Sequence, residues 1–185
     1  MGERLILVRH GQCQSNLSPW QPGTPYRDED DQLTALGLEQ ASRAARELAS
    51  FGLRDGFRIV SSPHTRAHQT ARVIMGVLDR EAGLLLDADL VEKEEFESFH
   101  DTLLRARRAI SAAQPTGGDL VCITHGHVIQ SIVADALGLV ADSCQRLHPV
   151  NCAISVILGT QLISYNQVHH LREFPHGALY LTDLD

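Results

Sequence analysis

The chain has 185 residues, 43% of them hydrophobic, and it carries a formal net charge of −7. This length suits one domain with a substantial core, so we expect residues 1–185 to form a single domain. The acidic balance and the lack of a basic stripe argue against nucleic acid as a partner, and no apolar run approaches the length of a transmembrane helix, so no membrane partner is expected either.

The first predicted element is a strand over residues 4–8, because a continuous apolar run is typical of a strand that is covered on both faces. A stretch rich in proline and acidic residues follows, and we expect it to form a loop at the mouth of a pocket, with Trp20 and Tyr26 as candidates to line the entrance. Thr34 then stands where a helix N-cap is expected, and apolar residues at helical spacing continue to about Phe51.

Strands and helices alternate along the rest of the chain. Residues 57–60 are a second predicted strand, after which Ser62 as N-cap and Pro63 at the first helical position start a helix to about Leu78. The later predictions are a weak strand over 84–86, a helix over 98–113, a strand over 120–124, a helix over 127–137 that ends at Gly138, and a hairpin of 153–158 with 162–165. We therefore expect an α/β fold, a three-layer αβα sandwich with a mostly parallel central sheet and an antiparallel edge.

The cysteine pattern is typical of a protein from a reducing compartment. The four of them, Cys13, Cys122, Cys144 and Cys152, show no C-x-x-C pair and no spacing typical of zinc ligands. Cys122 and Cys152 lie in apolar runs and are predicted to be buried thiols. Because the apolar run before Arg9 is also too short for a signal peptide, we predict a cytoplasmic protein.

Two histidines follow predicted strands directly. Arg9-His10-Gly11 comes after the first strand, and His125-Gly126 comes after the strand over 120–124. Ligands of open parallel sheets bind outside the carboxyl ends of the strands, so His10 and His125 are expected to converge on one pocket beside Arg9. A guanidinium with two imidazoles indicates an anion, and most plausibly a phosphate that is attacked by a ring nitrogen.

A further arginine follows the second predicted strand. Arg66 lies in the run Ser61-Ser62-Pro63-His64-Thr65-Arg66, about one turn into a predicted helix. The amides and dipole of a helix N-terminus favour an anion there, and a guanidinium adds bidentate recognition of two phosphate oxygens. The neighbouring His64 could also approach the pocket.

These residues resemble the motifs of a known family, the histidine phosphatases related to phosphoglycerate mutase. The matching blocks, in chain order, are Val8-Arg9-His10-Gly11 with Asn16; Leu33-Thr34-x-x-Gly37-x-x-Gln40-Ala41; Ser61-Ser62-Pro63-x-x-Arg66-Ala67-x-Gln69-Thr70-Ala71; Thr124-His125-Gly126; Asn151-Cys152-Ala153-Ile154; and Tyr165-Asn166-x-x-His169-x-Leu171. One Arg-His-Gly tripeptide arises by chance, whereas all these blocks in one order are specific. The resemblance implies a single histidine-phosphatase domain with the phosphoglycerate-mutase-like fold.

The resemblance also implies roles for the site residues. His10 would be the nucleophile that forms a phosphohistidine, and Arg9, Arg66 and His125 would hold the phosphoryl oxygens. The predicted substrate-binding residues are Ser15, Asn16, Gly126 and His127, the last through its backbone N–H. No cofactor and no metal are expected, because the two arginines and His125 supply positive charge.

A general acid must protonate the leaving oxygen, and the family takes it from a glutamate after the third strand. Glu92 occupies that place, with Glu94 and Glu95 as competitors. Many relatives follow this glutamate with a Gly-x-Trp-Glu-Gly stretch and a long excursion, whereas here the chain passes through Phe96-Glu97-Ser98 directly into a helix. We therefore expect a shortened lid region and an open site, which favours hydrolysis over transfer to a second hydroxyl.

The sequence therefore favours a metal-independent phosphatase that hydrolyses phosphate monoesters through a phosphohistidine intermediate. The first alternative is a phosphoglycerate-type mutase, and others are a phosphohistidine or phosphoprotein phosphatase and an inactive phospho-ligand-binding module. A phosphorylated small molecule is the expected substrate, with a phosphoprotein as the alternative. The sequence leaves the exact substrate and the oligomeric state open.

Overall fold

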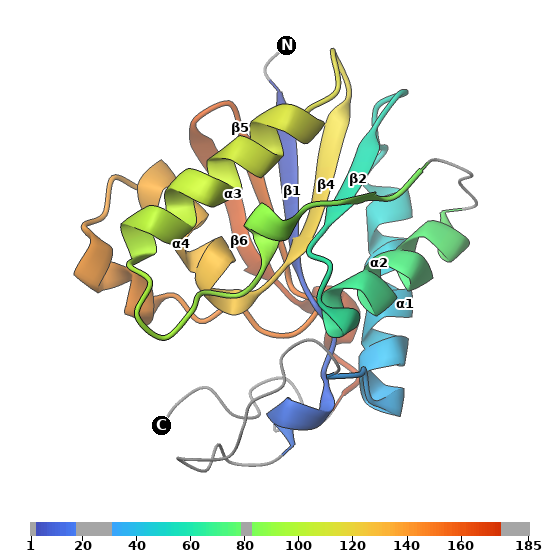
Figure 1. The fold of residues 1–185 in the computed structure, drawn as a ribbon. Helices are drawn as coiled ribbons and strands as arrows, with labels where there is room; N and C mark the ends of the chain where they lie inside the picture. The colour runs from blue at the N-terminus through green and yellow to red at the C-terminus, as the bar shows by residue number, and fades with distance from the viewer. Residues whose placement is uncertain (1–2, 18–30, 79–82, 175–185) are drawn as a thin grey trace.

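The computed structural model describes residues 3–17, 31–78 and 83–174, and these form a six-stranded sheet with helices on both faces (Figure 1). The strands are β1 (Arg4–Arg9), β2 (Arg58–Ser61), β3 (Leu85–Leu86), β4 (Asp119–Thr124), β5 (Ile154–Leu158) and β6 (Gln161–Gln167). Their order across the sheet is β3-β2-β4-β1-β5-β6. Of these six, β5 alone runs against the others, because β1 and β6 both pair with it in antiparallel fashion. The predicted mostly parallel sheet with an antiparallel edge is confirmed.

Helices cover the two faces of the sheet in pairs (Figure 1). The four α-helices of the described residues are α1 (Ala35–Ser50), α2 (Thr65–Val77), α3 (Phe99–Ala113) and α4 (Gly126–Ala136). One core joins the sheet to α1 and α2, and a second core on the opposite face joins it to α3 and α4. Short 3-10 helices lie at Gln14–Asn16, Ala88–Leu90, Ala141–Arg146 and His169–Leu171.

The apolar runs of the inner strands follow from this double cover. In β1, Ile6 and Val8 belong to the core under α1 and α2, whereas Leu7 between them belongs to the core under α3 and α4. In β4, Val121 and Cys122 divide in the same way. Side chains alternate across a strand, so a strand with helices on both faces must be apolar at every position.

The helix ends are set by local hydrogen bonds. Thr34 is the N-cap of α1, and its side chain accepts the Gly37 N–H, as predicted. The prediction for α2 is wrong: the helix begins at Thr65 with His64 as the N-cap, and not at Ser62 and Pro63. The reason is that Ser62 still continues the pairing of β2 with β4, because its N–H donates to the carbonyl of Ile123 over 3.0 Å.

The later elements agree with the predictions. The helix α4 ends before Gly138, which has a φ of 66°, and the β5–β6 hairpin turns at Gly159, which has a φ of 60°. Both values lie where a side chain is unfavourable, so glycine suits them. All four cysteines are buried free thiols, as predicted for Cys122 and Cys152. Among the helices of the described residues, none has the length and apolar character needed to cross a bilayer.

The segment between β3 and α3 is short. After the 3-10 helix at Ala88–Leu90 the chain runs from Val91 to Ser98, which caps α3 by accepting the Asp101 N–H. The connection from Glu92 to α3 is therefore direct, and the shortened lid region stays a prediction. The predicted entrance residues Trp20 and Tyr26 lie outside the described residues.

Candidate active site

The two histidines lie at the carboxyl ends of neighbouring parallel strands. Arg9, the last residue of β1, pairs with Thr124, the last residue of β4, and the His10 N–H donates to the Thr124 carbonyl over 3.0 Å. His10 and His125 therefore leave the sheet side by side, with ring centroids 5.2 Å apart. Both are buried, with exposed fractions of 2% and 0%. This is the edge of the sheet where ligands are expected.

The ring nitrogens of His10 have different roles. Nδ1 lies 2.8 Å from the carbonyl oxygen of Gly11. Because a carbonyl can only accept, Nδ1 carries the proton and Nε2 carries the lone pair. The Nε–H of Arg66 donates to this Nε2 over 3.2 Å. The acceptor that orients the ring could not be identified from the sequence, and it is the backbone of the next residue.

His125 is held in the neutral form. Nη2 of Arg66 lies 3.0 Å from Nδ1, and since a guanidinium only donates, Nδ1 is the acceptor. Nε2 then carries the proton and donates to Oγ of Ser62 over 2.8 Å. Burial and the nearby charge of Arg66 keep the pKa of His125 well below its usual value. The sequence assigned Ser62 to a helix cap, and its contact with His125 was missed.

Arg9 and Glu92 both lie close to Gly126, the first residue of α4. A Cβ atom built on Gly126 would be 3.8 Å from Cζ of Arg9 and 3.9 Å from Oε2 of Glu92. Nη1 of Arg9 also donates to the carbonyl of Pro149 over 2.7 Å. Both side chains therefore lie near the start of α4, directly after His125.

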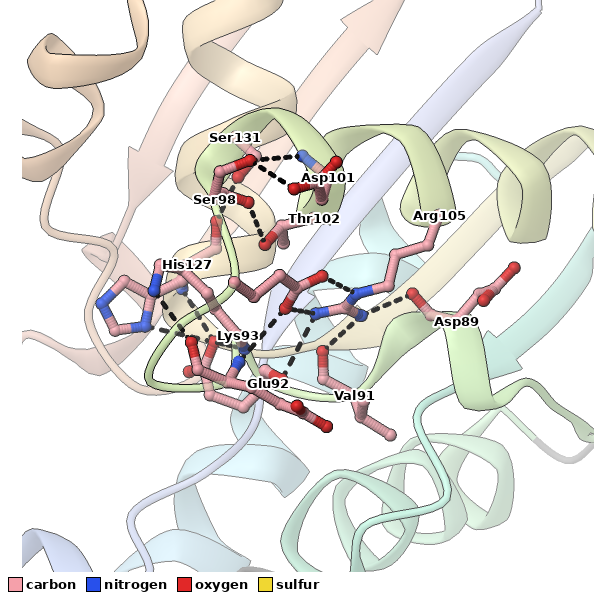
Figure 2. A network of polar contacts seen from close by, with 12 residues as sticks. Asp89, Val91, Glu92, Lys93, Ser98, Asp101, Thr102, Arg105, His127 and Ser131 are labelled. Carbon is pink, nitrogen blue, oxygen red and sulfur yellow. Dashed lines mark hydrogen bonds and ion pairs between the residues drawn. The ribbon is translucent and has the colours of Figure 1, made fainter.

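Glu92 is distinguished from its two competitors by location. Glu94 and Glu95 are exposed, whereas the Glu92 side chain is 20% exposed and faces α4. Its Oε1 accepts the Lys93 N–H over 2.8 Å and lies 3.2 Å from Nδ1 of His127, as Figure 2 shows. Burial raises the pKa of Glu92, but the hydrogen bond and charge of His127 outweigh it, and the pKa lies below its usual value.

The predicted substrate-binding residues have partners of their own. Oδ1 of Asn16 accepts from the Cys13 N–H and from Nδ2 of Asn151, each over 3.2 Å, so its Nδ2 group is the donor. The hydroxyl of Ser15 donates to Oδ2 of Asp31 over 2.5 Å. The His127 N–H, expected to meet a phosphate oxygen, donates instead to Oε1 of Glu92 over 3.3 Å. Phosphate contacts of these residues stay predictions.

The loop that carries His10 is packed against the start of α1. A Cβ on Gly11 would lie 2.5 Å from the carbonyl oxygen of Gly37, and a Cβ on Gly37 would lie 2.0 Å from that of Gln12. Oε1 of Gln40 accepts the Gln12 N–H over 2.8 Å, and Oγ1 of Thr70 accepts the Gly11 N–H over 3.0 Å. These motif residues thus hold the backbone around His10.

The late motif supports the same loop from the other side. Nδ2 of Asn151 donates to the His10 carbonyl over 3.0 Å, and the Cys152 N–H donates to the Arg9 carbonyl over 3.0 Å. Sequence reasoning gave Asn151 no function. The motif block was the available signal, but the contact spans 141 positions of the chain and needed the fold to be seen.

A parallel sheet that presents buried histidines and arginine at its carboxyl edge fits an α/β enzyme that handles phosphate. The model of the histidine phosphatase superfamily (branch 1) matches residues 5–94 and 85–162. The chain belongs to this superfamily.

Relatives and solved structures agree with this assignment. A relative named "Probable phosphoglycerate mutase GpmB" from Enterobacter sp. (strain 638) is 29% identical over 83% of this chain and 84% of its own length. A protein of the same name from Proteus mirabilis is 27% identical over 82% and 83%.

Two solved structures share the fold. A phosphoserine phosphatase mutant from Entamoeba histolytica, in complex with phosphoserine, has a TM-score of 0.74 at 21% identity and covers 91% of this chain and 99% of its own. A mycobacterial glucosyl-3-phosphoglycerate phosphatase in complex with VO3 has a TM-score of 0.72 at 23% identity, with coverages of 88% and 98%.

Proposed function

We propose that this chain is a phosphatase that hydrolyses phosphate monoesters through a phosphohistidine on His10. The observation that carries the proposal is the Nε2 lone pair of His10, which is oriented by the Gly11 carbonyl and faces the Arg66 guanidinium. A neutral imidazole with an oriented lone pair is a competent nucleophile, and phosphoryl transfer otherwise needs positioning and charge stabilisation.

The first step forms the intermediate. Nε2 of His10 bonds to phosphorus while the bond from phosphorus to the ester oxygen breaks, and that oxygen takes a proton from Glu92. We assign the proton to Oε2, the oxygen that faces Gly126 and Arg9, because Oε1 is occupied by N–H groups. Arg9 and Arg66 stabilise the charge on the phosphoryl oxygens. His125 orients Arg66 through Nδ1, and its own contact with phosphate stays a prediction.

The second step releases phosphate. A water molecule attacks phosphorus and gives a proton to the Glu92 carboxylate, so the acid of the first step becomes the base of the second. The phosphorus–nitrogen bond breaks, and its electron pair returns to Nε2 of His10. Because the two guanidinium groups supply the positive charge, we propose that no metal takes part. Activity should then survive an excess of chelator.

The test is phosphate release from a broad panel of phosphate esters by the wild type and His10→Ala. We expect the variant to be inactive while its circular dichroism and melting temperature stay those of the wild type. Quenching the wild-type reaction in alkali should trap a phosphoryl adduct that is stable to base and labile to acid. Substantial turnover by His10→Ala, or loss of wild-type activity on chelation, would contradict the mechanism.

The second candidate is a phosphoglycerate-type mutase, which the name of the 29%-identical relative favours. The same first step would serve it, and in the second step a hydroxyl of the substrate would replace water. Product analysis distinguishes the two, since a mutase conserves the ester and a phosphatase releases inorganic phosphate. The short connection from Glu92 to α3 supports the phosphatase.

For the substrate we propose a phosphorylated small molecule. The support comes from the names of the structural neighbours, a phosphoserine phosphatase and a glucosyl-3-phosphoglycerate phosphatase. A phosphoprotein is the alternative, and the ester panel should include phosphopeptides to decide between them. We also propose that the protein acts in the cytoplasm, which its four buried free thiols support.

A further inference from the structure

An arginine on α3 binds the backbone of the segment that carries Glu92. Nη1 of Arg105 donates to the carbonyls of Asp89 and Val91, each over 2.7 Å, and Nη2 donates to the carbonyl of Glu92 over 3.3 Å. Figure 2 shows the guanidinium between the helix and this segment. One side chain therefore satisfies three carbonyls within four consecutive residues.

The guanidinium is itself fixed by a carboxylate. Nε and Nη2 of Arg105 donate to Oε1 and Oε2 of Glu97 over 2.6 and 2.9 Å. The two side chains are only 12% and 16% exposed, so the pair is well shielded from water. A planar two-point contact of this kind fixes direction as well as distance, which lysine cannot reproduce.

The opposite side of the segment is hydrogen-bonded to β4, the strand that precedes His125. Oγ1 of Thr124 donates to the carbonyl of Leu90 over 2.7 Å, and Thr124 immediately precedes His125. Together, Thr124 and Arg105 bind every carbonyl from Asp89 to Glu92. The backbone that presents Glu92 is thus held between β4 and α3, although the chain makes no long excursion there.

We propose that Arg105 is a positioning residue that sets the location of the Glu92 carboxyl relative to the leaving oxygen of the substrate. This inference rests on the proposed function, in which Glu92 is the proton donor. Arg105 contacts backbone and Glu97 rather than the reacting atoms, so it acts through Glu92. A proton donor works over a narrow range of distance, and a displacement of about 1 Å can cost about 100-fold in rate.

The chemistry provides a specific test. An alkyl phosphate has a poor leaving group that needs a proton, whereas p-nitrophenyl phosphate has a good one that does not. In Arg105→Gln we expect kcat/KM to fall by about 10- to 100-fold for an alkyl phosphate such as glycerol phosphate. For p-nitrophenyl phosphate, kcat/KM should fall by about threefold or less, because its leaving group does not need the proton that the displaced acid supplies. Glu92→Gln should show the same selectivity, with a larger loss.

The matched control is Arg108, one turn further along α3. Its Nε and Nη2 bind the Asp89 carboxylate over 3.0 and 3.1 Å, and the side chain is 66% exposed. Arg108→Gln removes the same charge from the same helix and a contact to the same segment, but it leaves all the backbone carbonyls bound. We expect its kcat/KM to match the wild type for both substrates.

A double variant decides whether Arg105 acts through Glu92. If it does, Glu92→Gln with Arg105→Gln should be no slower on the alkyl phosphate than Glu92→Gln alone. Equal losses on both substrates, additive losses in the double variant, or no loss at all would overturn the inference. If Arg105→Gln does not fold, Arg105→Lys keeps the charge and is measured instead, with the same expectations.

The outcomes separate this inference from the proposed function. An active wild type with an inactive His10→Ala supports the phosphatase, whatever Arg105 does. If Glu92→Gln then shows no preference for the good leaving group, the acid is misassigned and the role of Arg105 fails with it. If Glu92→Gln shows that preference and Arg105→Gln does not, only the positioning role is refuted.

Discussion

At the scale of single residues, the site depends on how one guanidinium divides its hydrogen bonds. Arg66 donates through Nε to His10 and through Nη2 to His125, and it is 2% exposed. Both imidazoles therefore present lone pairs to the same planar group. The buried cation lowers the pKa of His125, because it disfavours a second positive charge beside it.

The first prediction at this scale concerns Arg66→Lys. A lysine keeps the charge but cannot make two parallel contacts from one planar group. We expect kcat/KM for phosphate esters to fall by about 100- to 1000-fold, as when one donor to a transition-state oxyanion is removed. Arg72→Lys, an exposed position on the same helix, should retain wild-type kinetics. Near-wild-type activity of Arg66→Lys would mean that charge alone suffices.

The second prediction concerns the pH dependence set by His127. Its hydrogen bond and charge lower the pKa of Glu92 against the effect of burial. Removing His127 takes away both of these effects, so the pKa of Glu92 rises relative to the wild type. The acid acts in its protonated form, and activity is lost as pH rises through that pKa. In His127→Ala the basic limb of the kcat/KM profile should therefore move to higher pH.

The measurement uses an alkyl phosphate, because only a poor leaving group makes the proton donor limiting. The control is His100→Ala, which removes an exposed histidine of α3 and should leave the limb in place. A limb that stays fixed or moves to lower pH in His127→Ala would show that Glu92 is not the group that titrates.

At the scale of elements, the first turn of α1 is fitted to the His10 loop at backbone distance. The third prediction is that Gly37→Ala lowers the free energy of unfolding by about 1–3 kcal/mol, since its Cβ would lie 2.0 Å from the Gln12 carbonyl oxygen and neither backbone can yield cheaply. It should also lower kcat, because the shifted loop carries His10.

Gly76→Ala is the control for this change. Gly76 lies in α2, and a Cβ there would meet nothing within 4 Å. Alanine is the better helix former, so this variant should be more stable by up to about 1 kcal/mol, with unchanged kcat. Chemical denaturation of both variants gives the comparison. A Gly37→Ala protein as stable and active as the wild type would rule out the tight fit.

The elements themselves could be predicted from the sequence where the signal is local. Apolar runs identified the buried strands, and Thr34 and Gly138 marked the ends of their helices as observed. The error at Ser62 has a physical cause. Serine is a residue type that favours the N-cap, but its hydroxyl here accepts a hydrogen bond from His125, 63 positions away. A local propensity cannot reveal such a partner.

The features of the site also differ in whether the sequence could predict them. Placing His10 and His125 at strand ends followed from the sequence because parallel strands share one carboxyl edge. Which nitrogen of His10 holds the lone pair, and which of three glutamates lies near Gly126, depended on distances that the fold sets. Arg105 carried no signal of its own, because its partners are backbone carbonyls. That residues 1–185 form one domain stays a prediction.

At the scale of the whole molecule, the charged groups that hold the sheet together lie at the end opposite the site. Asp119 begins β4, and its side chain is fully buried against Arg4 of β1 and Arg54, which are 21% and 26% exposed. The site begins after the last residue of the same strand, about 17 Å away at the usual rise per residue. A substitution at Asp119 should therefore change the stability of the protein without changing its catalysis.

The fourth prediction follows from Asp119. Burial raises the pKa of its carboxyl, but the hydrogen bond from Arg4 and the Arg54 N–H outweigh it, so the pKa in the folded state lies below that in the unfolded chain. A lowered pKa adds stability that is complete above the unfolded value of about 3.9 and is lost as pH falls through the folded value. At pH 7 we expect Asp119→Asn to lose about 1–3 kcal/mol, the range for a hydrogen bond to a charged group.

Urea unfolding of wild type and Asp119→Asn over a range of pH tests this. The difference between them should be constant near neutrality and should shrink below about pH 4, as first the unfolded chain and then the folded protein binds a proton at this carboxyl. Asp135→Asn, which breaks the exposed pair with Arg107, should change stability by less than about 1 kcal/mol at any pH. Because Asp119 is remote from His10, its variant should keep wild-type kcat/KM at temperatures where it is folded. A loss of activity there would show that the two ends of the sheet are coupled, and a stability difference that persists in acid would show that the ionised carboxylate is not its source.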